Sequence, residues 1–228
     1  YMWGTSGLGL NVEKVRAALG EDAALDTWGL IFDPEKAAKL ADCGISLLDD
    51  PTEVFSAALV YLGKDPNSLD PADLDAATEL LNAVHPHIRY FHSSQYISDL
   101  ATGDLCVAHG YSGDVLQARE RASEADGPEI AYRIPREGAA LWTDVMAIPA
   151  DAPHPEAAQA FIAYLLEPEV IADVSNYVYY ANPNLAATEH LDVALHRRPC
   201  GRQTSSTRFG PAFSGLFAAH RRNDLFRD

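Results

Sequence analysis

The sequence predicts an α/β fold with a largely parallel sheet. Short apolar runs such as "ISLL" and "LCVAH" alternate with longer stretches of helical periodicity, which is the order of strands and helices that builds such a sheet. The 228 residues are 47% hydrophobic, enough for one good core or two small ones. No run of eighteen or more apolar residues occurs, so no membrane-spanning helix is expected.

The first elements follow from local signals in residues 1–88. "YMWGTSGLGLNV" predicts an extended piece followed by a glycine-rich turn, and "NVEKVRAALG" predicts a helix that ends at Gly20. A helix is expected from about Pro34 to Ala41, because proline fits the first turn of a helix. "ISLLDD" is a short apolar strand. Further helices are expected to begin at Pro51 and at Pro71, where apolar residues recur at helical spacing.

The later elements are read in the same way. "SSQYISDLATGD" predicts a helix capped by serine and ended by glycine, "LCVAHGY" a strand and "SGDVLQARERASEA" the next helix. "EIAYRIP" and "LWTDVMAIPA" predict strands around a turn at "REGAA". Residues 155–180 predict one helix or two, divided near Pro168. Residues 191–228 have no sustained periodicity, and we expect an atypical basic tail that is disordered or translated out of register.

The charge of the chain is strongly negative and unevenly distributed. The net charge is −16, but residues 191–228 hold seven arginines, no lysine and three aspartates, so residues 1–190 carry −20. Such a surface repels nucleic acid and anionic lipid and attracts cations. Nucleic acid is therefore not an expected partner, although net acidity by itself can serve solubility alone.

Three cysteines occur, Cys43, Cys106 and Cys200, and none belongs to a C-x-x-C pair. A structural zinc site is therefore not expected. Cys43 and Cys106 both lie in segments predicted to be buried strands, so the two can be bridged. The residues alone leave a disulfide and two buried thiols equally open.

Several motifs are weak signals for other chemistry. "GTSGLG" at 4–9 lacks the spacing and the lysine of a phosphate-binding loop, so a tight turn is expected there. His85, His87 and His92 form a histidine cluster without a supporting acidic or cysteine ligand. Two readings remain as alternatives: a triad of Ser93, His109 and Asp114 without a nucleophile elbow, and a glycosidase-like carboxylate pair, Asp114 and Asp144.

Carboxylates that stand beside aromatic residues are the more productive pattern. Tyr111 precedes Asp114 by three residues, and Trp142 precedes Asp144 by two, so in a strand these last two share a face. Glu53 falls in the first turn of a predicted helix, and Tyr180 precedes a turn. Carboxylates and aromatic faces suit an organic cation, because the acid accepts hydrogen bonds from an ammonium while the rings stack on its methylenes. Each residue also has a plainer role, the acids at helix N-termini and the rings in a core.

Long blocks of the chain, from Tyr1 to about Thr188, resemble the periplasmic polyamine-binding proteins of bacterial ABC uptake systems, the putrescine/spermidine type. They include "GLGLNVEKV", "CGISLLDDPTEVF", "ALVYLGKDPNS", "IRYFHSSQYISDLATGDLCVAHGYSGDV", "IPREGAALWTDVMAIPADA" and "YYANPNLAAT". The resemblance implies a periplasmic-binding-protein-like two-lobe fold of type II, with one lobe complete and the other partial. The family's amino-terminal portion has no counterpart here, so we expect an N-terminally truncated chain with further sequence upstream.

The resemblance also implies a division of the chain. Residues 1–6 are expected to form a hinge crossing segment, 7–130 the second α/β lobe, and 131–190 the return crossing with part of the first lobe. The family's amine-binding carboxylates fall on Glu53, Asp114 and Asp144, and its cleft aromatics on Tyr111, Trp142 and Tyr180. Ser93, Ser94 and Gln95 are possible rim residues. Asp114 is expected both to cap its helix and to face the cleft.

The function implied is that of a solute-binding protein without catalysis or cofactor. It captures putrescine or spermidine in an acidic, aromatic-lined cleft and delivers it to the membrane permease of an ABC transporter. A periplasmic location, a monomer and a Cys43–Cys106 disulfide are expected with it. The alternatives are a carboxylate-dependent hydrolase that uses Asp114, or a binder of another cation or a metal on the same fold through His85–His92.

Overall fold

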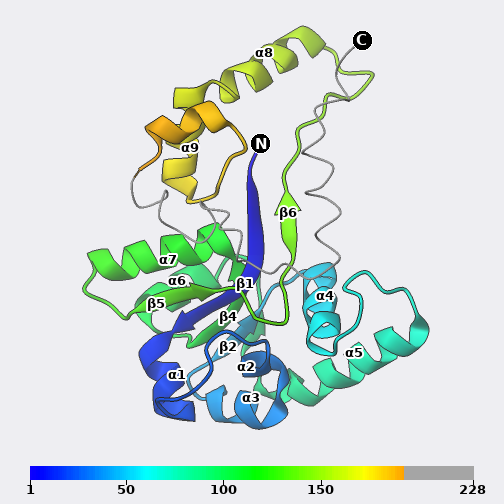
Figure 1. The fold of residues 1–228 in the computed structure, drawn as a ribbon, viewed down its shortest axis with the longest axis vertical. Helices are drawn as coiled ribbons and strands as arrows, with labels where there is room; N and C mark the ends of the chain where they lie inside the picture. Colours follow the sequence, from blue (N-terminus) through cyan, green and yellow to red (C-terminus); the bar gives the residue numbers. More distant parts are fainter. Residues whose placement is uncertain (193–228) are drawn as a thin grey trace.

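Strand β1, Trp3–Asn11, organises the part of the chain that this computed structural model describes, residues 1–192 (Figure 1). It is one continuous strand, so the expectation of a glycine-rich turn at 4–9 is wrong. The glycines serve close packing instead: a Cβ added to Gly7 would lie 2.7 Å from the Tyr132 hydroxyl, and one added to Gly9 would lie 2.7 Å from Leu100. Neighbouring side chains therefore pack directly on the backbone of β1.

Three helices begin with the dipeptide Asp-Pro, and each starts where the sequence predicts. They are α3 (Pro34–Leu40), α4 (Pro51–Tyr61) and α5 (Pro71–Val84). In each case the preceding aspartate accepts hydrogen bonds from backbone N–H groups of the first turn, while the proline occupies a position that needs no N–H donor. Helix α1 (Val12–Leu19) ends at Gly20, whose positive φ of 98° suits glycine.

The remaining elements complete the described chain. The strands are β2 (Ile45–Leu47), β3 (Tyr90–Phe91), β4 (Val107–Tyr111), β5 (Ile130–Arg133) and β6 (Leu141–Thr143). The helices are α2 (Gly29–Phe32), α6 (Tyr96–Thr102), α7 (Ser112–Glu124), α8 (Pro155–Leu165) and α9 (Pro168–Val178), with short 3₁₀ turns η1 (His85–His87) and η2 (Leu185–His190). Residues 155–180 thus form two helices divided at Pro168, one of the two outcomes expected. No described helix is long and apolar enough to span a membrane.

The sheet is mixed rather than largely parallel, with strand order β3-β2-β4-β1-β5. Strands β2, β3 and β4 are parallel as predicted, but β1 runs antiparallel to β4, β5 and β6. Strand β1 enters the sheet from the side on which α8 and α9 lie, and its start pairs with β6 outside the main sheet (Figure 1). The strand predicted at 141–150 is correspondingly short, because it pairs with β1 only over Leu141–Thr143.

Helices cover both faces of the sheet and enclose two apolar clusters (Figure 1). One cluster is built from the α1–α5 side and includes Trp28, Phe32 and Leu59, and the other lies under α6 and α7 and includes Tyr96 and Leu100. Cys43 and Cys106 are joined by a disulfide within the first cluster, so the pairing implied by the resemblance is confirmed.

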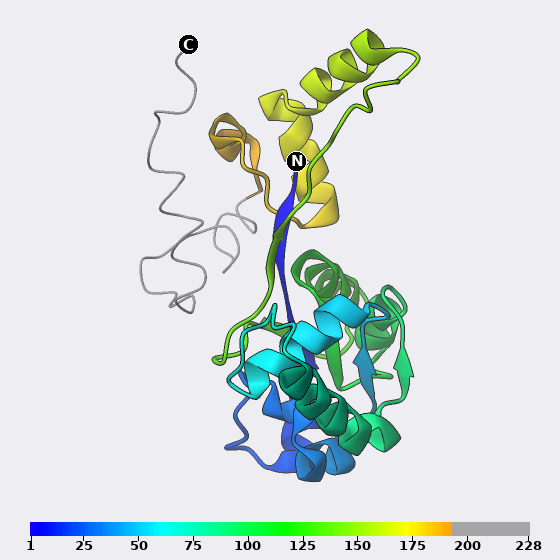
Figure 2. The same ribbon diagram turned by 90° about the vertical axis from the view of Figure 1, so that its right-hand side faces the viewer.

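The start of β1 and strand β6 extend away from this main body toward a second, smaller one (Figure 2). That second body contains α8, α9 and η2, and its small cluster holds Met2, Ile171, Ala172 and Ala187. Trp3 is bridged to Ala181 there. The tail expected at 191–228 lies, from residue 193 on, outside the described residues.

Candidate functional site

Asp114 lies in the first turn of α7 and accepts a hydrogen bond from each of two tyrosines. The hydroxyl of Tyr96 donates to Oδ2 at 2.8 Å, and the hydroxyl of Tyr180 donates to Oδ1 at 2.7 Å. No side chain caps α7, whose N-cap residue is Tyr111, so the expectation that Asp114 caps this helix is wrong. The two oxygens are held by tyrosine hydroxyls instead, although the charge still lies where the helix dipole favours it.

The two tyrosines remain hydroxyl donors because burial raises the pKa of both phenols well above the usual value. The negative charge of Asp114 is the second cause in each case. Tyr96 is fully buried, and its oxygen also accepts the backbone N–H of Tyr111 at 3.0 Å. Sequence reasoning missed Tyr96, because an aromatic residue within a helix carries no signal that its hydroxyl reaches a carboxylate eighteen positions later. A carboxylate offers about four lone-pair sites, so two remain for another donor.

Glu53 stands in the first turn of α4 with a carboxylate that is largely withdrawn from solvent. Burial raises its pKa above the ordinary value, the Ser6 hydroxyl acts in the opposite direction, and the charge of Asp50 adds to the rise. Glu53 Oε2 and Ser6 Oγ are both buried without a hydrogen bond of normal geometry. Two polar atoms thus lie unsatisfied at this end of the site, an arrangement that an incoming donor would relieve.

Tyr111, at the end of β4, lies within the field of three acidic groups. Burial raises the pKa of its hydroxyl to about 12, and the charges of Glu53, Asp50 and Asp114 contribute in that order. Across the strand pair, Tyr111 is opposite Ser6 of β1. The structure therefore brings Glu53, Tyr111 and Asp114 to one end of the main sheet, although they come from three different elements.

The three predicted aromatic residues form a continuous array with Trp142 in the middle. The ring of Trp142 meets Tyr111 edge-on at 5.9 Å and Tyr180 at 5.3 Å between ring centroids. The array fits because two glycines lie against it: a Cβ on Gly4 would be 2.7 Å from the Trp142 ring, and one on Gly113 would be 2.6 Å from the Tyr180 ring. Trp142 Nε1 is buried without an acceptor.

Asp144 follows β6 and is exposed, and the structure records no hydrogen bond or ion pair for its carboxylate. Its backbone is fixed, since its N–H donates to Met2 O at 2.8 Å and its carbonyl accepts from the amino group of Tyr1 at 3.0 Å. The crossing strands thus hold Asp144 two residues beyond Trp142 while its carboxylate stays available.

The side chains of two of the predicted rim residues, Ser93 and Gln95, are hydrogen-bonded to neighbouring segments. Ser93 Oγ accepts the N–H of Asp49, and the amide of Gln95 donates to Asp99. The helix expected to be capped by serine, α6, has Gln95 at its N-cap without a side-chain bond, so that expectation is wrong. The ring of His92 takes this role, because its Nδ1 accepts the N–H groups of Ser94 and Gln95.

The triad of Ser93, His109 and Asp114 is not assembled. His109 is fully buried, neither ring nitrogen has a hydrogen-bond partner, and burial lowers its pKa to about 3. Within residues 1–192, no group of three His, Cys, Asp or Glu side chains is placed to hold a metal ion, and this includes the cluster of His85, His87 and His92.

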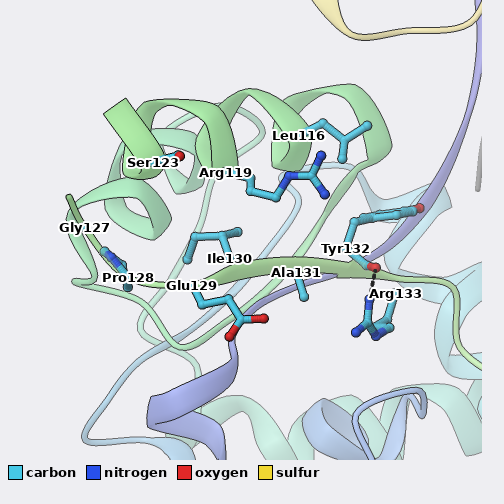
Figure 3. A pocket seen from close by; sticks show the side chains of 10 residues that line it. All are labelled: Leu116, Arg119, Ser123, Gly127, Pro128, Glu129, Ile130, Ala131, Tyr132 and Arg133. Carbon is cyan, nitrogen blue, oxygen red and sulfur yellow. Dashed lines mark hydrogen bonds between the residues drawn. The ribbon is translucent and has the colours of Figure 1, made fainter. Parts of the chain in front are cut away.

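One hollow of the main body lies away from these residues. It has a volume of about 470 Å³ and opens between α7 and the edge strand β5, with Arg119 and Arg133 among its lining (Figure 3). A smaller hollow of about 220 Å³ lies between α4 and α5. Neither hollow is lined by a predicted site residue, and the candidate site lies where β1, β4 and β6 meet the N-termini of α4 and α7.

Comparison with known proteins gives a consistent result. Residues 1–197 match the family model described as "Bacterial extracellular solute-binding protein". The chain is 53% identical over 201 residues to the putrescine-binding periplasmic protein PotF of Escherichia coli, and 49% identical over 200 residues to the putrescine-binding periplasmic protein SpuD of Pseudomonas aeruginosa. Each match covers 87% of this chain but only 54% of the relative.

Solved structures agree with the sequence matches. A putative spermidine/putrescine ABC transporter protein from Listeria monocytogenes is 33% identical with a TM-score of 0.73, over 95% of this chain and 60% of that one. The spermidine/putrescine substrate-binding protein PotD from Streptococcus pneumoniae is 26% identical with a TM-score of 0.71, over 96% of this chain and 65% of that one. The chain thus has the fold of periplasmic solute-binding proteins but spans about half the length of the relatives that it matches.

Proposed function

This chain belongs to the family of bacterial extracellular solute-binding proteins, and we propose that it captures putrescine or spermidine for an ABC transporter. The predicted periplasmic location is confirmed, since PotF and SpuD are named periplasmic and the family is extracellular. The Cys43–Cys106 disulfide fits the oxidising conditions of that compartment.

The main support for the proposal is that the candidate carboxylates lie next to the aromatic side chains. The aromatic array runs from Tyr111 through Trp142 to Tyr180, and Tyr180 is hydrogen-bonded to Asp114 while the pKa of Tyr111 responds to Glu53. A polyamine has the matching pattern of charged nitrogens separated by methylenes. Its ammonium groups donate charge-assisted hydrogen bonds to the carboxylates, and its methylenes pack on the aromatic faces.

The unsatisfied atoms give the amine a specific place. An ammonium at Glu53 offers three donors, so it can serve Glu53 Oε2 and Ser6 Oγ together. Asp114 and Asp144 are left for the other nitrogens, because Asp114 retains lone pairs and no bond to the Asp144 carboxylate is recorded. In this arrangement Glu53 binds one end of an extended cation, and Asp114 and Asp144 bind the nitrogen or nitrogens that remain.

We assign residues 1–6 to the crossing between lobes, 7–130 to the complete lobe, and 131–190 to the return crossing with part of the first lobe. The pairing of β1 with β6, between the two bodies, supports a double crossing, while β5 keeps the first residues of the return segment, up to Arg133, in the main sheet. Closure of the lobes follows from the differential affinity of the amine for the closed state, and the closed form then docks to the permease. The role is transport without catalysis, and the protein acts as a monomer.

The test is calorimetric titration of an extended protein, in which the chain is joined to the residues of E. coli PotF that its match leaves out. Putrescine and spermidine are compared with 1,4-butanediol, which has the length of putrescine but no charge. We expect tight binding of at least one amine and none of the diol. Absence of amine binding in a sample that melts cooperatively rejects the proposal. The 228-residue chain alone should bind more weakly, because lost cleft contacts cost about 1–3 kcal/mol each.

A further inference from the structure

The hydroxyl of Tyr96 lies between two residues of the candidate site. It donates to Asp114 Oδ2 at 2.8 Å and accepts the backbone N–H of Tyr111 at 3.0 Å. Tyr111 carries one of the candidate rings and Asp114 one of the candidate carboxylates, and the two are three residues apart where β4 ends and α7 begins. A single oxygen atom therefore joins the end of β4 that carries the ring to the start of α7 that carries the acid.

The direction of this hydrogen-bonded chain is fixed by its members. An amide N–H can only donate and an ionised carboxylate can only accept, so the proton of the Tyr96 hydroxyl has to point at Asp114. The proton stays on Tyr96, because burial and the charge of Asp114 raise the pKa of the phenol far above its usual value. Hydrogen bonds arranged head to tail in this way polarise and strengthen one another.

The side chain of Tyr96 has little freedom to move. It is fully buried, and its ring lies on the backbone of β4, since a Cβ added to Gly110 would be 2.6 Å from the ring. A side chain held by close packing gives its hydroxyl a defined position. A fully buried residue does not touch a bound solute, so any effect of Tyr96 on binding has to pass through the groups that its hydroxyl holds.

Tyr180, the second donor to Asp114, comes from a different part of the fold. It follows α9 and packs against the apolar cluster of the smaller body, whereas Tyr96 belongs to α6 and to the apolar cluster of the main body that also contains the buried side of α7. The main body therefore holds Oδ2 of Asp114 by itself, and only the bond to Oδ1 involves the segment after α9.

We infer that Tyr96 is a positioning residue of the amine site, whose hydroxyl sets the direction of the Asp114 carboxylate relative to the Tyr111 ring without contacting the amine. The inference rests on the proposed function, because it concerns how tightly the same site binds an amine. An acceptor that is already held in place binds a cation more tightly than one that must be ordered on binding. Loss of one hydroxyl oxygen should therefore lower the affinity although every candidate ligand group is retained.

The experiment is calorimetric titration of the extended protein with putrescine. Tyr96→Phe removes the hydroxyl and keeps the ring, and the affinity should fall by about tenfold, the loss expected for a hydrogen bond to a charged group. Tyr90→Phe is the matched control, because the Tyr90 hydroxyl donates to the Asp99 carboxylate at 2.6 Å and its ring packs against the same apolar cluster. The control should lower the melting temperature, as Tyr96→Phe does, and leave the affinity unchanged.

Asp114→Ala shows whether the effect passes through the carboxylate. In that background, titrated to millimolar putrescine, Tyr96→Phe should change the affinity by less than about twofold, whereas two independent effects would multiply. A second measurement needs no amine. In Tyr96→Phe the backbone amide of Tyr111 loses its acceptor, so in the 228-residue chain it should exchange with solvent about tenfold faster or more, and Tyr90→Phe should leave this amide unchanged.

Four results would overturn the inference and leave the proposed function standing. They are equal affinities of Tyr96→Phe and the unchanged protein, an equal loss of affinity in Tyr90→Phe, an undiminished loss in the Asp114→Ala background, and an unchanged exchange rate at Tyr111. If the unchanged extended protein binds no amine, the proposed function itself fails and the inference fails with it.

Discussion

The hydroxyl of Tyr180 donates a hydrogen bond of 2.7 Å to Asp114, a residue 66 positions earlier in the chain. This bond joins the segment that follows α9 to the first turn of α7, and so links the smaller body to the main one. Because Trp142 packs against the same tyrosine ring, the bond also fixes one end of the aromatic array. Tyr180 therefore both holds one end of the aromatic array in place and donates a hydrogen bond to the carboxylate of Asp114.

Tyr180→Phe should destabilise the chain by about 1–2 kcal/mol, because one oxygen of Asp114 loses its donor while the ring contacts remain. Urea unfolding measures the change. Tyr177→Phe is the control, since Tyr177 is 84% exposed and its hydroxyl has no recorded bond. If both variants unfold alike, the hydrogen bond contributes nothing to stability.

Gly113→Ala should destabilise the chain by about 1–3 kcal/mol, because the new methyl would lie 2.6 Å from the Tyr180 ring. In a Tyr180→Ala background the clash is absent, and the same change should stabilise α7 by about 0.5–1 kcal/mol, since alanine favours helices. Thermal unfolding of the unchanged chain, Gly113→Ala, Tyr180→Ala and the double variant measures the coupling free energy between residues 113 and 180. The same sign in both backgrounds would show that Tyr180 is not what keeps residue 113 small.

Acid should destabilise the main body through His109. Burial lowers its pKa from 6.5 to about 3, only partly offset by Asp50, so the unfolded chain binds this proton more readily than the folded one. The stability associated with neutral His109 is complete above pH 6.5 and is lost as pH falls toward 3, by roughly 1 kcal/mol per pH unit. Denaturation of the chain and of His109→Gln across this range measures the difference in slope. His154→Gln, the same substitution at an exposed histidine whose side chain makes no cap bond, is the matched control. An equal slope in His109→Gln and the unchanged chain would contradict the prediction.

The sequence predicted most local structure and part of the site, for a physical reason. Asp-Pro starts and glycine ends are encoded within a few residues, so α3, α4, α5 and the end of α1 could be located. The direction of β1 could not, because strand pairing joins residues a hundred positions apart. The bond from Tyr96 to Asp114 and the burial of His109 depend on the same long-range packing. The local pattern of carboxylates beside aromatic residues indicated the acids and rings, and the family resemblance assigned them to one cleft.

Glu53→Gln should stabilise the chain at neutral pH while weakening amine binding by the extended protein. Burial raises the pKa of Glu53, so the folded state resists ionisation; stability is complete below the ordinary carboxyl range and falls as pH rises through the raised pKa. The glutamine variant lacks this loss, so the two proteins should have equal stability in acid and diverge toward pH 7. Thermal melts across pH and calorimetry with putrescine measure the two effects. Glu35→Gln, at an exposed site, should change neither, and reduced stability of Glu53→Gln at pH 7 would contradict the prediction.

Asp144→Asn should lower amine affinity without changing the stability of the fold. The carboxylate of Asp144 is exposed and has no recorded bond, so its replacement should leave the melting temperature unchanged. An ammonium bound there would lose a charge-assisted acceptor, and amine affinity of the extended protein should fall by about tenfold or more. Asp42→Asn is the matched control, because Asp42 is an exposed aspartate whose backbone carbonyl, rather than its side chain, accepts from Arg89. Equal affinities in the two variants would mean that the amine does not reach the end of β6, and the site would then have to lie nearer Glu53.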